Sequence, residues 1–95
     1  MLNFDFPHPI GIVIASGVEI GKNVTIYQNV TIGRQKITDE NCYPIIEDNV
    51  IIYAGAVVYG KIKIGRGSTI GANAIVSITI PPNTVVVGHN QIITK

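Results

Sequence analysis

The segment Ile14–Gly33, IASGVEIGKNVTIYQNVTIG, carries a branched aliphatic residue at every sixth position. The first run of these residues consists of Ile14, Ile20, Ile26 and Ile32. After an interruption, a second run begins at Ile46 and continues at the same spacing to Val76. Neither the 3.6-residue period of a helix nor the alternation of an ordinary strand produces a sustained period of six. The period therefore indicates an architecture in which each hexad is one structural unit.

The third residue after each aliphatic is usually glycine or asparagine, and Lys61 is an exception. The residues at this place are Gly17, Asn23, Asn29, Asn49, Gly55, Gly67 and Asn73. Glycine and asparagine enter the left-handed backbone region at the least cost, so each hexad is expected to end in a tight corner. We predict an all-β fold, a parallel β-helix with three short strands per coil and inward-pointing aliphatic side chains.

The chain is expected to form a single domain over residues 1–95. Residues 1–7 would be an N-terminal lead-in or cap, and residues 33–45 an extruded loop, because they are polar and include a proline. Residues 80–95 would form a C-terminal cap. The pair Pro81–Pro82 is expected to end the register after Val76, since proline cannot donate a ladder hydrogen bond.

Composition narrows the possible partners and the compartment. Apolar residues make up 46% of the chain and charged residues 14%, which is a low charged fraction for a small monomer and suggests that a second copy covers part of the surface. The net charge is +1 and lysine and arginine form no cluster, so nucleic acid is not an expected partner. The sequence shows neither a signal peptide nor an apolar run of membrane-spanning length. We therefore expect a cytoplasmic protein without membrane insertion.

Four phrases narrow the repeat to a known family. They are HPIGIVI (His8–Ile14), QNVTIG (Gln28–Gly33), TIGANAIV (Thr69–Val76) and IPPNTVVVG (Ile80–Gly88). Together they resemble the hexapeptide-repeat acyltransferases, and within these the serine acetyltransferases and related sugar or capsular polysaccharide O-acetyltransferases. The resemblance implies a left-handed coil, a homotrimer with active sites between adjacent subunits, and acetyl-CoA as the co-substrate without any metal.

His8 is the candidate catalytic residue. It stands six residues before Ile14, so the hexad count places it at a ladder position. The resemblance implies that His8 is the general base, and an imidazole with an ordinary pKa of about 6.5 suits the removal of a hydroxyl proton near neutral pH. The resemblance also implies that Tyr43 binds the acceptor, and it assigns the acetyl-CoA contacts to Gly33, Ala54, Gly55 and Ala72.

The acceptor divides the functional hypotheses. In serine acetyltransferases an Arg-His pair at the end of the loop holds serine, and Cys42–Tyr43 stands there in this chain. This departure favours transfer of the acetyl group to a hydroxyl of a sugar or polysaccharide precursor. Serine O-acetylation is one alternative, because the sequence of the whole repeat is similar to that of serine acetyltransferases. A non-catalytic trimeric scaffold or a truncated enzyme is another alternative. A zinc hydratase of the same fold needs three histidines, whereas this chain has only His8 and His89.

Overall fold

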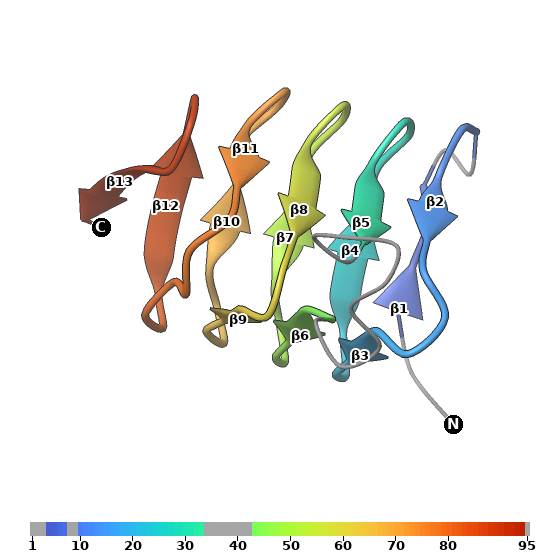
Figure 1. The fold of residues 1–95 in the computed structure, drawn as a ribbon, viewed down its shortest axis with the longest axis horizontal. Coiled ribbons are helices and arrows are strands. Elements are labelled where there is room, and N and C mark those ends of the chain that lie inside the picture. Colours follow the sequence, from blue (N-terminus) through green and yellow to red (C-terminus); the bar gives the residue numbers. More distant parts are fainter. Residues whose placement is uncertain (1–3, 8–9, 34–42, 95) are drawn as a thin grey trace.

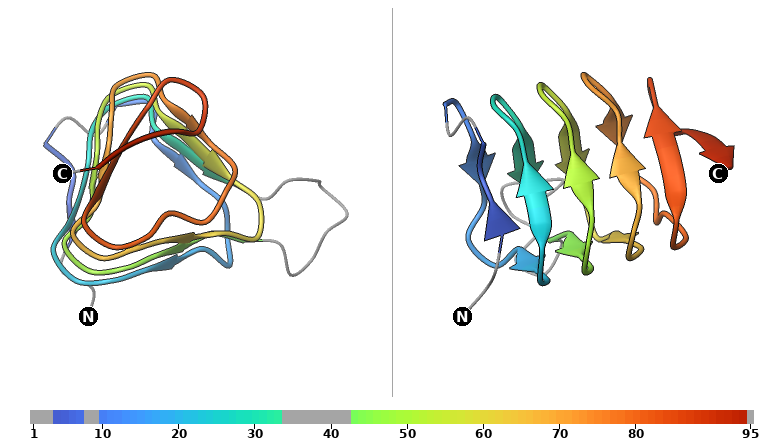
Figure 2. Two further views of the ribbon diagram at one scale, coloured as in Figure 1. Left: turned by 90° about the vertical axis from the view of Figure 1, so that its left-hand side faces the viewer. Right: turned by 180° about the vertical axis from the view of Figure 1, so that it is seen from behind.

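The computed structural model describes residues 4–7, 10–33 and 43–94. Its strands lie in parallel sheets on three faces of a prism, as the side view in Figure 1 shows. Seen end-on, the prism has a triangular outline (Figure 2). The chain is thus a left-handed parallel β-helix, which confirms the all-β fold predicted from the period of six.

We name the three faces A, B and C by their strands. Face A consists of β1 (Phe4–Asp5), β4 (Val24–Ile26), β7 (Ile51–Ile52), β10 (Thr69–Ile70), β12 (Thr84–Val87) and β13 (Gln91–Thr94). Face B consists of β2 (Val13–Ile14), β5 (Thr31–Gly33), β8 (Val57–Tyr59) and β11 (Ile75–Val76). Face C consists of β3 (Glu19–Ile20), β6 (Ile45–Ile46) and β9 (Lys63–Ile64). The chain passes from A to B to C in every coil, so the prism has an AB, a BC and a CA corner.

The strand register follows directly from three hexads per coil. Val13 pairs with Thr31 and Ile45 pairs with Lys63, in both cases 18 residues further along the chain. Glu19 pairs with Ile45, which is 26 residues away. The eight additional residues fall at the BC corner, within the range predicted as an extruded loop, and residues 34–42 of that range lie outside the described part of the chain.

The ladder residues form the core. Ladder aliphatic side chains from Ile20 to Val76 are buried, and seven of them have no exposed surface: Ile26, Ile32, Ile52, Val58, Ile64, Ile70 and Val76. Ile14 of the first coil is partly buried and packs against them. Each ladder side chain stacks on its equivalent one coil away, and burial of such a side chain stabilises the fold by roughly 1.5–3 kcal/mol relative to leaving it in water. The prediction that these residues are core is confirmed.

The corners use the residues that the pattern predicts. Asn23, Asn29, Asn49 and Asn73 have φ angles of 57–61°, and Gly55 and Gly67 have φ angles of 75° and 72°. At the corner where Lys61 breaks the rule, Gly60 takes the positive φ instead, at 99°. The expected corner therefore forms there too, one residue earlier in the chain.

The first coil departs from the hexad count. Phe4 pairs with Val24 and Asp5 with Thr25, so the next residue, Phe6, is level with the core residue Ile26. Phe6 is partly buried and packs against the core. His8, which the hexad count places at a ladder position, lies outside the described residues, so that placement stays a prediction.

The β-helix also continues beyond the point where the prolines were expected to end it. Ile80 bridges to Ile64 and Val86 pairs with Ile70, each after 16 residues instead of 18, and both side chains are buried. The buried hydroxyl of Ser68 accepts a hydrogen bond from the Thr84 N–H (3.2 Å) and donates one to the Pro81 carbonyl (3.0 Å). The Ser68 side chain thus ties the last coil to the preceding one at this corner.

The end of face A is closed by a reversal of the chain. Strand β13 runs antiparallel to β12, with Val85 opposite Ile93 and Val87 opposite Gln91. Strand β12 is therefore paired on both sides, which leaves β13 as the outer strand of this sheet (Figure 1).

Candidate functional site at the corners flanking face B

His8, the predicted general base, lies outside the described residues. The described residues on either side of it, Pro7 and Ile10, are both exposed, and 71% of Ile10 is accessible to solvent. The Ile10 carbonyl accepts a hydrogen bond from the Asn29 N–H (2.8 Å), which fixes the end of this segment against the AB corner of the next coil.

The predicted cofactor residues Ala54, Gly55 and Ala72 lie together at the AB corner. The Asn73 N–H donates to the Ala54 carbonyl (2.9 Å), so Ala72 lies one coil beyond Ala54 in the same position. A Cβ on Gly55 would collide with Oδ1 of Asn73, and its φ of 75° also favours glycine. Ala54 is half-buried and Ala72 is exposed. At these two coils the corner therefore carries small side chains.

The other two predicted residues, Gly33 and Tyr43, lie at the BC corner. Gly33 ends β5, and its carbonyl accepts a hydrogen bond from the Gly60 N–H (3.1 Å). A Cβ at Gly33 would have no atom of another described residue within 4 Å, its two chain neighbours aside. The Tyr43 ring covers Gly17 of the preceding coil, with ring atoms 2.8–2.9 Å from where a Cβ of Gly17 would be. Only glycine at position 17 leaves room for this ring.

Within one chain, face B separates these two groups. Gly55 and Ala72 precede strands β8 and β11 of this face, whereas Gly33 ends β5 and Tyr43 lies before β6 of the next face. The end-on view in Figure 2 shows the corners as distinct vertices of the triangle. The fold thus brings together Ala54, Gly55 and Ala72, and it sets Gly33 and Tyr43 at another corner, so the two groups are not joined in one subunit.

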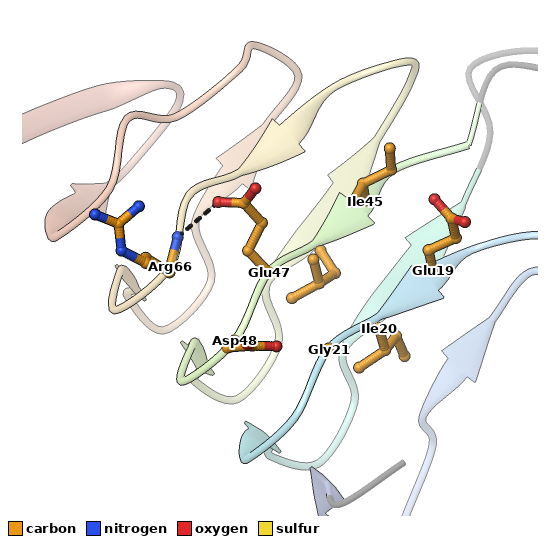
Figure 3. Close-up of a pocket in the computed structure, with 8 residues that line it drawn as sticks. Glu19, Ile20, Gly21, Ile45, Glu47, Asp48 and Arg66 are labelled. Carbon is orange, nitrogen blue, oxygen red and sulfur yellow. Dashed lines mark hydrogen bonds between the residues drawn. The ribbon is translucent and has the colours of Figure 1, made fainter. Parts of the chain in front are cut away.

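A depression on face C has a different character (Figure 3). It has a volume of about 360 Å³ and is lined by Glu19, Ile20, Gly21, Ile45, Ile46, Glu47, Asp48 and Arg66. Glu47 Oε1 accepts a hydrogen bond from the Arg66 N–H (3.0 Å), and Asp48 Oδ1 accepts one from the Lys22 N–H (2.8 Å). These carboxylates support the CA corner of the neighbouring coils. None of the predicted site residues lines this depression, so we assign it no part in the chemistry.

Gln28 lies at the AB corner but was not among the site residues predicted from the sequence. The Gly55 N–H donates to the Gln28 carbonyl (3.0 Å), which places Gln28 in line with Ala54 and Ala72 at the AB corner. Its side-chain Oε1 is buried and has no hydrogen-bond partner among residues 4–7, 10–33 and 43–94. Counting two residues past each ladder aliphatic of face A would have grouped Gln28 with the two alanines.

The described part of the chain contains no group of three histidine, cysteine or acidic residues that could hold a metal ion. It likewise contains no helix of the length and hydropathy required to cross a membrane.

Comparison with known proteins connects this geometry to a family. Residues 43–77 match the family described as bacterial transferase hexapeptide (six repeats). The chain is 49% identical over 81 residues to a serine acetyltransferase of Mycobacterium tuberculosis, which covers 85% of this chain and 35% of that protein. A serine acetyltransferase of Bacillus licheniformis is 42% identical over 85 residues, which covers 90% of this chain and 39% of that protein. The chain thus spans little more than a third of the length of the curated relatives it matches.

Solved structures give the same result. The structure of serine acetyltransferase from Brucella abortus strain S19 in complex with coenzyme A superposes with a TM-score of 0.88 at 30% identity, covering 97% of this chain and 37% of that one. The resemblance to serine acetyltransferases inferred from the sequence is confirmed.

Proposed function

Since the chain belongs to the hexapeptide-repeat acyltransferase superfamily, we propose that it forms the β-helix of an acetyl-CoA-dependent O-acetyltransferase. The observation that carries this proposal is the 49% identity to a serine acetyltransferase over 85% of the chain. The row of small residues at the AB corner supports it, because an extended pantetheine arm needs an edge where backbone groups are accessible.

His8 is the general base in this proposal. It takes the proton from the acceptor hydroxyl while the hydroxyl oxygen attacks the thioester carbonyl, and it returns the proton to the thiolate when the carbon–sulfur bond breaks. The negative oxygen of the tetrahedral intermediate needs N–H donors, and backbone amides near Gly33 and Ala54 are the groups that we assign to this task. Gly55 and Ala72 continue the cofactor contact along the corner.

The acceptor that we propose is the hydroxyl of serine. The relatives and solved structures described above are serine acetyltransferases, and this favours serine over the sugar hydroxyl that the sequence analysis preferred. A sugar hydroxyl remains the second candidate because Cys42–Tyr43 replaces the family's Arg-His pair. Cys42 lies outside the described residues, and the phenol of Tyr43 is suited to hydrogen-bond a hydroxyl.

An assay of CoA release distinguishes the two acceptors. With acetyl-CoA and L-serine, the chain is expected to release CoA well above the rate of acetyl-CoA hydrolysis, and D-serine should give little release. Release that requires a sugar hydroxyl and is absent with L-serine would reverse the order of the two candidates. An absence of release with every hydroxyl acceptor, together with no binding of CoA, would favour the non-catalytic scaffold.

We also propose that the site is completed in a homotrimer. A cyclic arrangement sets the AB corner of one subunit beside the BC corner of the next, which would unite the two groups that face B separates. Exposed apolar side chains on face B, Val13 at 58% and Ile75 at 39%, support a covered face. Light scattering is expected to give three times the chain mass of 10.2 kDa, and a monomeric mass would contradict the proposal.

A further inference from the structure

The three residues at positions 27–29 have different environments in the structure. The Tyr27 ring stacks on the Tyr53 ring, with centroids 5.0 Å apart and planes inclined by 22°. Asn29 has a φ of 59°, and its Oδ1 occupies the place where a side chain of Gly11 would lie. Both residues are therefore accounted for by packing between coils. Gln28, between them, has a buried side-chain oxygen that no described group hydrogen-bonds.

A buried amide oxygen without a donor is unfavourable. Its desolvation costs about 1–3 kcal/mol, and the great majority of buried polar groups in proteins are paired. An unpaired oxygen in a native fold therefore calls for an explanation, and a ligand that donates a hydrogen bond is one. Gln28 as a whole is half-buried, whereas its Oε1 is covered, so a ligand at the corner reaches this oxygen when the side-chain amide turns outward.

The residues in line with Gln28 at the AB corner indicate what kind of ligand could reach its side chain. Ile10, Gln28, Ala54 and Ala72 succeed one another at the AB corner, as the hydrogen bonds from Asn29, Gly55 and Asn73 to the first three carbonyls show. Successive coils are about 4.8 Å apart, and Gln28 is the member of this row whose side chain has hydrogen-bonding groups. An extended molecule that passes Ala72 and Ala54 along the corner arrives next at Gln28.

We propose that Gln28 Oε1 accepts a hydrogen bond from an amide N–H of the pantetheine arm of acetyl-CoA. The pantetheine arm carries two secondary amides. When the rest of the arm lies along Ala54 and Ala72, the amide nearer the sulfur is the donor that reaches Gln28. Gln28 is thus a positioning residue that holds the thioester at the Ile10 end of the corner. This inference rests on the proposed function, because it requires that coenzyme A binds along the AB corner.

The test compares Gln28→Met with wild type by calorimetric titration of coenzyme A and by thermal melting. Methionine has a similar size without hydrogen-bonding groups, so the variant is expected to bind coenzyme A about threefold to tenfold more weakly. The ligand-free variant should melt at the same temperature as wild type or higher, because an unpaired buried oxygen has been removed. The matched control is Gln91→Met, the same change at an exposed position of β13, which should alter neither quantity.

Three outcomes would overturn this assignment. Equal affinity of Gln28→Met and wild type for coenzyme A removes the proposed hydrogen bond. A melting temperature several degrees below that of wild type shows that the Gln28 side chain is paired within the protein. Unchanged CoA affinity with a raised KM for serine assigns the residue to the acceptor. Failure of wild type to bind coenzyme A would reject the proposed function as well, so the wild-type titration separates the two proposals.

Discussion

Replacement of His8 with alanine is expected to lower kcat by about a hundredfold or more, with the melting temperature nearly unchanged. The reason is that alanine cannot take the hydroxyl proton, while the first-coil side chain that packs against the core after β1 is that of Phe6. If the imidazole acts in the transition state and not in ground-state binding, kcat and kcat/KM should fall together. Steady-state kinetics with acetyl-CoA and serine measures both quantities.

The other histidine provides the control for this variant. His89 is exposed and bridges to Ile75 of β11, and His89→Ala should retain the wild-type kcat. The assignment of His8 as the base is refuted by turnover of His8→Ala within a few-fold of wild type. A large loss of thermal stability in His8→Ala would instead show that the residue is structural, which the exposure of Pro7 and Ile10 on either side argues against.

Gly65→Ala is expected to destabilise the fold by about 3 kcal/mol, which corresponds to a fall in melting temperature of roughly 10–20 °C. The last coil crosses the CA corner close to Gly65, whose N–H donates a hydrogen bond to the Ile80 carbonyl (2.8 Å). A Cβ at this position would lie within 3.0 Å of backbone atoms of Pro81 and Pro82. Backbone held by two proline rings cannot rotate away as the end of a flexible side chain could.

Gly33→Ala is the matched control for this effect. Gly33 also follows a ladder aliphatic, but its Cβ would meet no atom within 4 Å in the described part of the chain, so the melting temperature should change little. Equal melting temperatures for Gly65→Ala and wild type would contradict the close approach of the last coil. Thermal unfolding followed by circular dichroism at equal protein concentrations makes the comparison.

The sequence by itself determined the architecture of this protein. A ladder residue every six positions can be buried repeatedly only if the chain turns three times per coil, and asparagine or glycine at the third position allows each turn. The same regularity identified the family, because phrases such as TIGANAIV carry both the ladder and the corner. Such local rules can be read from the sequence because each hexad contacts mainly its equivalents in the neighbouring coils.

The tertiary structure decided what depends on how the coils lie against one another. The place of Phe6 in the ladder follows from the pairing of β1 with β4. Counting hexads backward from Ile14 does not predict this pairing. The coil continues past Val76 because Ile80 and Val86 still reach the core after a shortened turn. The division of the site residues between two corners, and the position of Gln28 beside Ala54, likewise arise from stacking of residues that are distant in the chain. Such contacts are set by backbone pairing between coils. A period in the sequence does not specify which residues pair after a coil gains or loses residues.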